Sequence, residues 1–289
     1  MRILITADLH YDIARSRGGA EDLARRAVGA GGDALVLVGD TAGVEPAPWR
    51  KCLALFEAFG GRKLLVPGNH CLWCRHNETS LQRYHELLPD LAAEAGFLVL
   101  DHNPQVLDDV GLVGSVGWYD YSMADPALGI PEAFYEAKLS PGAAAHVGQD
   151  ALIETHRDAL TKRQMEILAR WMDGHHVRLG MSDKEFVARL SEKLESQLDA
   201  LVPQVKRIVA FMHHLPFAQQ VPPDRPDRFA FAAAYMGAAK FGQVLLACRK
   251  VTHVYCGHSH WPDRRKIGRL TVVNIGSTYV EKKLETLEL

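Results

Sequence analysis

The stretch from Arg2 to His10 reads RILITADLH, a short apolar run that ends in an aspartate and a histidine. Its isoleucine and leucine residues follow one another without polar alternation, which is typical of a strand buried on both faces of a sheet. The same design recurs at residues 34–40, ALVLVGD, where the run ends in Asp40. Sheets with two buried faces are covered by helices, so these stretches predict an α/β fold.

Further apolar runs and helical patterns continue this alternation along the chain. The other predicted strands span residues 63–66, 97–100, 111–116, 207–212, 251–255 and 270–275. Apolar residues at helical spacing predict helices over residues 20–30, 46–59, 79–95, 161–172, 183–201 and 238–250. Ser182, followed three residues later by Glu185, is a capping-box signature for the helix over 183–201. Strands that alternate with helices of this length support the α/β interpretation.

The segment at about residues 120–204 interrupts the alternation, because it contains helical patterns and no convincing strand. No linker rich in serine, glycine or proline marks its edges. We therefore expect a single domain over residues 1–289 that carries a mostly helical insertion at about residues 120–204. A chain of 289 residues is long enough to bury a large core.

The composition excludes several classes of protein. Hydrophobic residues make up 47% of the chain and charged residues 24%, which is ordinary for a globular protein. The formal net charge of −2 argues against nucleic acid as a partner. The apolar runs are too short to span a bilayer and the first one lacks signal-peptide features, so we expect a cytoplasmic protein with no membrane partner. Five cysteines without framework spacing predict reduced thiols.

Polar side chains suited to metal binding follow five of the predicted strands. The five segments are TADLH (6–10), VGD (38–40), PGNH (67–70), MHH (212–214) and GHSH (257–260). Ligand sites in an open α/β sheet form beyond the carboxyl ends of the strands, so we expect these segments to converge. Imidazole suits zinc, iron, manganese and nickel, while carboxylate and amide oxygens favour the harder of these ions. The glycines at 39, 68 and 257 allow a close backbone approach or a positive φ.

Taken in order, the motifs D-x-H, G-D, G-N-H, an apolar strand ending in His, and G-H-x-H resemble those of the calcineurin-like metallophosphoesterase superfamily. The resemblance runs from residue 8 to residue 260 and leaves the helical insertion outside it. Each motif alone is common, and the ordered set makes the resemblance specific. It implies a four-layer α/β/β/α sandwich of two packed mixed sheets.

The resemblance also implies a role for each motif residue. The ligands of one ion would be Asp8, His10 and His260, and those of a second ion would be Asn69, His213 and His258. Asp40 would bridge both ions. His70 would contact the substrate phosphate and assist the leaving group, since histidine can carry a proton at neutral pH. His213 is favoured as the ligand over its neighbour His214 because it comes first after the apolar run, and His214 stays open as the alternative.

The resemblance implies a metal-dependent phosphoric ester hydrolase with two divalent ions, drawn from manganese, iron, zinc and nickel. It would hydrolyse a phosphomonoester or phosphodiester by attack of a metal-bound hydroxide. The expected partner is a small phosphorylated substrate, with nucleotide-like molecules among the candidates and the oligomeric state left open. The alternative is a catalytically silent metal-binding interaction platform of the same fold. Loss of ligand residues would favour it, and none is missing here.

Two other runs allow more than one interpretation. The aromatic run WYDY at residues 118–121 follows a predicted strand and could line a pocket or pack in the core. The basic run RRK at residues 264–266 follows the last motif. It could reach an anionic substrate, but a solvated turn between strands is the favoured interpretation.

Overall fold

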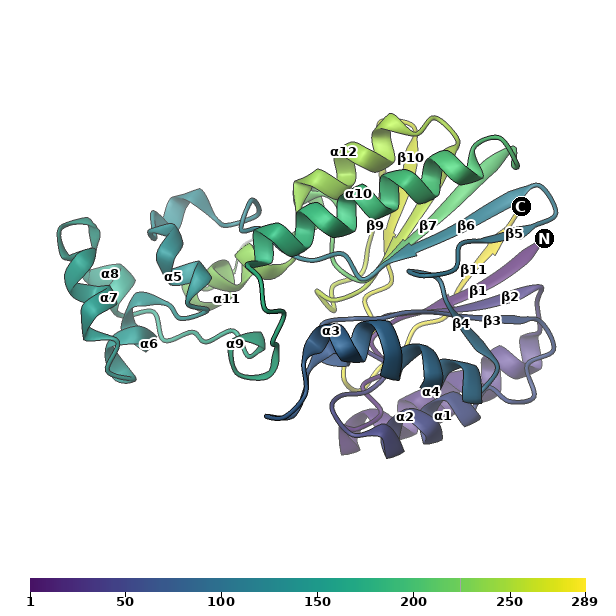
Figure 1. The fold of residues 1–289 in the computed structure, drawn as a ribbon, viewed down its shortest axis with the longest axis horizontal. Coiled ribbons are helices and arrows are strands. Elements are labelled where there is room, and N and C mark those ends of the chain that lie inside the picture. Colours follow the sequence, from purple (N-terminus) through teal and green to yellow (C-terminus); the bar gives the residue numbers. More distant parts are fainter. Residues whose placement is uncertain (224) are drawn as a thin grey trace.

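The computed structural model describes residues 1–223 and 225–289, and its centre is a pair of packed β-sheets (Figure 1). One sheet has the strand order β11-β1-β2-β3-β4 and the other β5-β6-β7-β8-β10-β9. The strands are β1 (Arg2–Thr6), β2 (Ala34–Val38), β3 (Arg62–Val66), β4 (Phe97–Val99), β5 (Gln105–Leu107), β6 (Val110–Ser115), β7 (Arg207–Met212), β8 (Val251–Cys256), β9 (Asp263–Ile267), β10 (Leu270–Asn274) and β11 (Glu285–Glu288). Both sheets are mixed, because β11, β5 and β9 each run antiparallel to their neighbours.

Helices cover the outer face of each sheet, which gives the predicted four-layer α/β/β/α sandwich. Figure 1 shows α1, α2 and α4 against one sheet and α10 and α12 against the other. These helices are α1 (Ala14–Ala30), α2 (Pro46–Ala54), α4 (Leu88–Glu94), α10 (Asp183–Leu201) and α12 (Ala239–Ala247). The fold class predicted from the sequence is confirmed.

The strands carry unbroken apolar runs because both of their faces are covered. In β1, Ile3 and Ile5 pack between the sheets, whereas Leu4 packs toward the helices. The register of β1, β2 and β3 is parallel, with Thr6 opposite Leu37 and Val38 opposite Val66. The carboxyl ends of these strands therefore lie side by side at one edge of the sheet.

Several predicted helices differ from the observed ones in detail. The helix predicted over 79–95 is α3 (Ser80–Gln82), a π-helical turn (Arg83–Leu87) and α4 in succession. Pro89 stands in the first turn of α4, and its missing N–H is a reason for the widened turn before it. The helix predicted over 161–172 is wrong beyond Met165, where α8 ends. Beyond Met165 the hydroxyl of Ser140 replaces helical hydrogen bonds. It donates to the backbone oxygen of Ile167 at 2.6 Å and accepts from the backbone nitrogen of Ala169 at 2.8 Å.

The favoured interpretation of residues 264–266 as a turn is also wrong, because they lie in β9. The side chains there are exposed or half-buried at the edge of the second sheet. An edge strand needs no apolar run, so neither β9 nor the short edge strands β5 and β11 gave a clear pattern in the sequence.

Between β6 and β7 the chain forms short helices that extend away from the sheets (Figure 1). They are α5 (Glu132–Glu136), α6 (Pro141–His146), α7 (Asp150–Thr155), α8 (Lys162–Met165) and α9 (Asp173–His176). A later helix, α11 (Asp227–Ala232), joins them, since Tyr135 stacks on Phe231 at 4.9 Å between ring centroids. The description of the chain as one domain with an insertion at about 120–204 stays a prediction. Among the described residues, no helix combines the length and apolar character needed to span a bilayer.

Candidate metal centre

The strand-end residues singled out in the sequence meet in one cluster between the two sheets. Potential ligand atoms lie within 4.8 Å of one another in three overlapping groups, Asp8–His10–His260, His10–Asp40–His70 and Asp40–His213–His258. The amide oxygen of Asn69 lies 3.2 Å from Nε2 of His213. The structure thus brings all eight predicted site residues together, and only His70 and His260 among them are less than fully buried.

Asp40 lies between the two halves of the cluster. Its Oδ2 is 3.6 Å from Nε2 of His10 and 3.4 Å from Nε2 of His213. Its Oδ1 accepts a hydrogen bond from the backbone nitrogen of His70 at 3.0 Å. Burial raises the pKa of this carboxyl, but the surrounding histidines outweigh burial and hold the pKa well below its ordinary value. An ionised carboxylate in this position can contact two cations at once.

Backbone carbonyl groups orient three of the imidazoles. Nδ1 of His213 lies 3.3 Å from the oxygen of Val38, Nε2 of His258 lies 3.1 Å from that of Tyr235, and Nδ1 of His260 lies 2.7 Å from that of Ser277. A ring nitrogen next to a carbonyl oxygen carries a proton, so in the neutral ring the other nitrogen presents its lone pair. The second nitrogens of His213 and His258, Nε2 and Nδ1, are 3.2 Å apart.

The remaining contacts leave polar atoms of the cluster without partners among the described residues. Neither ring nitrogen of His10 has a hydrogen-bond partner among the described residues, although the side chain is fully buried. Burial lowers the pKa values of His10 and His258 well below normal, which keeps both rings neutral. Burial also raises the pKa of Asp8. Buried carboxyl groups, imidazoles and an amide oxygen form a donor set that fits a pair of divalent cations.

His213 and His214 face different surroundings. Burial lowers the pKa of His213, but Asp40, Asp8 and the backbone oxygen of Val38 together outweigh burial and raise it to about 9. Nδ1 of His214 lies 2.9 Å from the oxygen of Val116, and its ring packs 5.2 Å from Trp118. Burial lowers the pKa of His214 to about 3. The geometry therefore places His213, and not His214, beside Asp40.

The backbone of the cluster is held in an uncommon conformation. Residues with a positive φ are Asp8 (57°), His10 (43°), Asp40 (48°), His258 (68°) and His260 (56°). Non-glycine residues adopt this region rarely, and where they do it is commonly at functional sites. Five of the eight predicted site residues thus have this backbone conformation.

The glycines before the motif residues are required by close packing. A Cβ atom at Gly39, whose φ is +85°, would lie 2.0 Å from Nδ1 of His213. A Cβ atom at Gly68 would lie 2.1 Å from Oδ1 of Asp40. The sequence-based expectation of a crowded centre is confirmed at both positions.

Asp173, at the first turn of α9, is a neighbour of the cluster that the sequence did not reveal. Its Oδ1 accepts hydrogen bonds from Nδ2 of Asn69 at 2.9 Å and from Nε1 of Trp73 at 2.6 Å. Its Oδ2 accepts from the hydroxyl of Tyr119 at 3.0 Å and from Nε1 of Trp171 at 2.8 Å. Asp173 follows no strand and belongs to no motif, so only the fold shows that it touches Asn69.

Lys282 is a second residue that the sequence did not single out. Its Nζ donates hydrogen bonds to the backbone oxygen of Asp8 at 2.5 Å and to that of Thr278 at 2.6 Å. Burial lowers the pKa of Lys282 to about 8. Through the bond to Asp8, the side chain of Lys282 holds the loop that follows β1 in place and brings positive charge close to Asp8.

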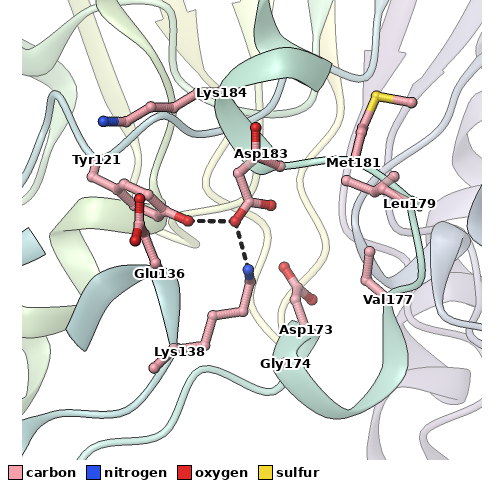
Figure 2. Close-up of a pocket in the computed structure, with 12 residues that line it drawn as sticks. Tyr121, Glu136, Lys138, Asp173, Gly174, Val177, Leu179, Met181, Asp183 and Lys184 are labelled. Atoms are coloured by element: carbon pink, nitrogen blue, oxygen red, sulfur yellow. Dashed lines mark hydrogen bonds and ion pairs between the residues drawn. The ribbon is translucent and has the colours of Figure 1, made fainter. Parts of the chain in front are cut away.

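A cleft of about 440 Å³ opens above the cluster. On its floor are Asp40, Asn69, His70, His258 and His260. Residues 118 and 119 are fully buried and lie outside this lining, so the core interpretation is correct for them, whereas Tyr121 of the same run lines a different pocket. A second pocket, of about 460 Å³, lies between α9 and the start of α10 (Figure 2). Asp173 lines both cavities and separates them.

Comparison with known proteins gives one family match and several structural neighbours. The family model described as calcineurin-like phosphoesterase matches residues 1–262. Phosphopantetheinyl hydrolase from Mycobacterium tuberculosis is similar in fold, with a TM-score of 0.66, 19% identity, and coverage of 96% of this chain and 89% of that one. No curated protein matches the sequence at a significant level.

Two further solved structures share the fold. The protein TT1561 of Thermus thermophilus gives a TM-score of 0.54 at 12% identity, over 99% of this chain and 97% of that one. A dimetal phosphatase from Danio rerio gives 0.52 at 14% identity, over 99% and 91%. At these identities the similarity concerns the fold.

Proposed function

Because the chain belongs to the calcineurin-like phosphoesterase family, we propose that it hydrolyses phosphomonoesters or phosphodiesters with the help of two divalent metal ions. The observation that carries this proposal is the cluster around Asp40, where buried carboxyl, imidazole and amide groups converge and both ring nitrogens of His10 lack a hydrogen-bond partner among the described residues. The cleft above the cluster gives a phosphate group access to it.

In this proposal the two halves of the cluster hold one ion each. The ligands are Asp8, His10 and His260 for the first ion, and Asn69, His213 and His258 for the second, with Asp40 shared between them. Two bound divalent ions neutralise the charge of the phosphate and acidify water for in-line attack. The protein holds the ligand atoms in place through the carbonyl contacts of its histidines and through Lys282 behind Asp8.

His70 is proposed to contact the phosphate and give a proton to the leaving group. Its ring faces the cleft and stacks on Trp73 at 3.8 Å between centroids. The hydrogen bond from its backbone nitrogen to Asp40 fixes the ring beside the cluster. His70→Gln should keep the metal content and lower kcat by about 10²-fold or more. Loss of metal together with activity would contradict this assignment.

The proposal is tested by metal analysis of the purified protein and by a substrate panel. The panel contains p-nitrophenyl phosphate, bis-p-nitrophenyl phosphate and, because of the structural neighbour, a phosphopantetheinyl ester. We expect turnover that needs manganese or a similar ion and stops with chelator. Asp40→Ala should remove both metal and turnover. Unchanged activity in Asp40→Ala would refute the proposal, and metal uptake without turnover on any ester would support the silent platform.

A further inference from the structure

The side chains that wall the cleft identify the kind of substrate that it admits. Besides the polar floor, the lining includes Trp73, Trp171, Met172, Phe229 and Met236. Met172 and Phe229 are 45% and 52% exposed, so they present apolar surface to whatever enters the cleft. Apolar residues exposed in a concave site commonly mark the place where a ligand binds.

The two indole rings offer only carbon surface to a ligand. The Nε1 atoms of Trp73 and Trp171 both donate hydrogen bonds to Asp173. Trp73 is held in a stack between His70 and His176, and Trp171 stacks on Tyr235. The rings are therefore fixed in place, and their polar edges are already used.

The walls carry little positive charge. Among the described residues that line the cleft, Arg170 is the only lysine or arginine. The metal cluster accounts for one phosphate group, so further phosphates would face apolar walls with Arg170 as their single counter-charge among the described lining residues.

We propose that the substrate is a phosphate ester whose organic group is an uncharged alkyl or aryl chain, and not a nucleoside polyphosphate. This inference rests on the proposed function, because it takes the cluster as the phosphate site. The organic group would lie against Trp171, Met172 and Phe229, and would be held mainly by burial of apolar surface.

Phosphonates test this without depending on turnover, because their C–P bond resists hydrolysis. Calorimetry on the manganese-loaded protein would compare methylphosphonate, hexylphosphonate and a methylene-bridged analogue of ADP. We expect hexylphosphonate to bind about tenfold tighter than methylphosphonate, or more, and tighter than the ADP analogue. Met172→Ala and Phe229→Ala should each remove most of this gain and leave methylphosphonate binding unchanged.

Leu168→Ala is the matched control, because Leu168 is 59% exposed in the same segment as Met172 but does not line the cleft. It should keep the wild-type ratio of affinities. Equal affinity for the two phosphonates, or tighter binding of the ADP analogue, would overturn the inference while leaving the phosphoesterase proposal intact. Failure to bind any phosphonate, together with no turnover, would count against the proposed function itself.

A separate observation concerns how Asn69 is oriented. An amide ligand binds a cation through its oxygen, so the side chain must be prevented from exchanging its oxygen and nitrogen positions. Asp173 does this, because its carboxylate accepts only and pairs with Nδ2 of Asn69. Three aromatic donors hold Asp173 in turn, and its side chain is 1% exposed.

We infer that Asp173 is a positioning residue for the second metal ion, supplied by the helical segment between β6 and β7. The predicted metal ligands themselves lie in loops that follow strands of the two sheets. The helical segment between β6 and β7 therefore contributes to metal binding by orienting Asn69, in addition to lining the cleft.

Asp183 provides a matched control for this inference. It is also buried, and it accepts a hydrogen bond from Nε1 of Trp118 at 2.7 Å. Figure 2 shows two further donors to Asp183, the hydroxyl of Tyr121 and Nζ of Lys138, the latter at 2.5 Å. Both acids thus receive an indole N–H and a tyrosine hydroxyl, but among the described residues no hydrogen bond or ion pair joins Asp183 to the metal cluster. Asp173→Asn and Asp183→Asn should destabilise the fold to a comparable degree.

Manganese titration by calorimetry separates the two roles. Asp173→Asn should weaken the binding of one of two ions by about 10- to 100-fold and leave the other unchanged. Asp183→Asn should keep both affinities within about threefold of wild type. The double variant Asn69→Asp/Asp173→Asn reverses donor and acceptor and should restore binding of the second ion. Wild-type affinities in Asp173→Asn, equal losses in both single variants, or no recovery in the double variant would overturn the inference.

Discussion

His213 and His214 illustrate how much depends on a single position at the end of a strand. Successive residues of an extended chain point to opposite sides, so one ring reaches Asp40 and the other turns toward Trp118. His213→Ala should lose about one equivalent of bound metal, whereas His214→Ala should keep both. Elemental analysis after dialysis against a metal buffer measures this. The reverse pattern would exchange the two assignments.

The pKa of His213 predicts how metal uptake depends on pH. In the metal-free protein Asp40 raises this pKa to about 9, above the value of ~6.5 of an unfolded chain. Protonation of His213 therefore stabilises the metal-free fold fully below pH ~6.5, and this stabilisation is lost as the pH rises to about 9. A cation must displace the proton, so affinity should rise by up to tenfold per pH unit between pH 7 and 9.

Proton release on metal binding checks the same point. Calorimetric titrations at pH 7.5 in two buffers of different ionisation enthalpy should report close to one proton released from His213. The release should disappear in His213→Ala and above about pH 9.5. A constant affinity across this range would contradict the prediction.

The residues that the sequence revealed and those that it missed differ in one physical respect. Asp8, Asp40 and His258 stand directly after apolar strands, so the position of the strand end also fixes the position of the side chain. Asp173 and Lys282 reach the cluster from segments whose path depends on tertiary packing. Their contacts follow from the assembled fold, and no local pattern in the sequence records them.

Among the elements, α10 is the one whose limits the sequence predicts best. The side chain of Ser182 accepts from the nitrogen of Glu185, and Glu185 accepts from the nitrogen of Ser182, which fixes the first turn. Phe186, Val187 and four buried leucines pack its inner face on β6 and α12. Strong local signals and a buried face agree here, and the helix forms as predicted.

Ser182→Ala should lower the free energy of unfolding by about 1 kcal/mol, because it leaves a backbone donor at the start of α10 without its partner. Urea unfolding followed by circular dichroism measures the change. Metal content and kcat should stay at the wild-type level, since the cap lies outside the cluster. A loss of metal in this variant would show that the start of α10 is coupled to the site.

Elements with weak local signals are the ones that the sequence misplaced. α8 ends at Met165 because Ser140 and Leu139 bind the chain that follows, through hydrogen bonds and a short β-bridge to Arg170. The spacing of apolar residues within one segment cannot predict that residues from a distant segment will bind its backbone. The strand β9 lies at a sheet edge, where exposed charged side chains resemble those of a turn.

For the whole molecule, metal binding and stability should be linked, because the cluster lies between the two sheets. A ligand that binds only the folded state stabilises it by about 2.7 kcal/mol at 100 times its Kd. Manganese should therefore raise the midpoint of urea unfolding, and chelator should return it to the metal-free value. Asp40→Ala is the control and should show no response to manganese. An equal response in both proteins would place the stabilising ions elsewhere.

The left-handed backbone at Asp8, His10, Asp40, His258 and His260 has a consequence for how the molecule tolerates damage. Each such residue costs roughly 1 kcal/mol or more, and the packed sheets beneath must supply that free energy. A substitution that opens a cavity in the interior, for example Val36→Ala, lowers the free energy of unfolding, which is only about 5–15 kcal/mol for a typical domain. The turns carrying the ligands would relax before the strands separate, so failure to retain cations would be the earliest sign of a weakened interior.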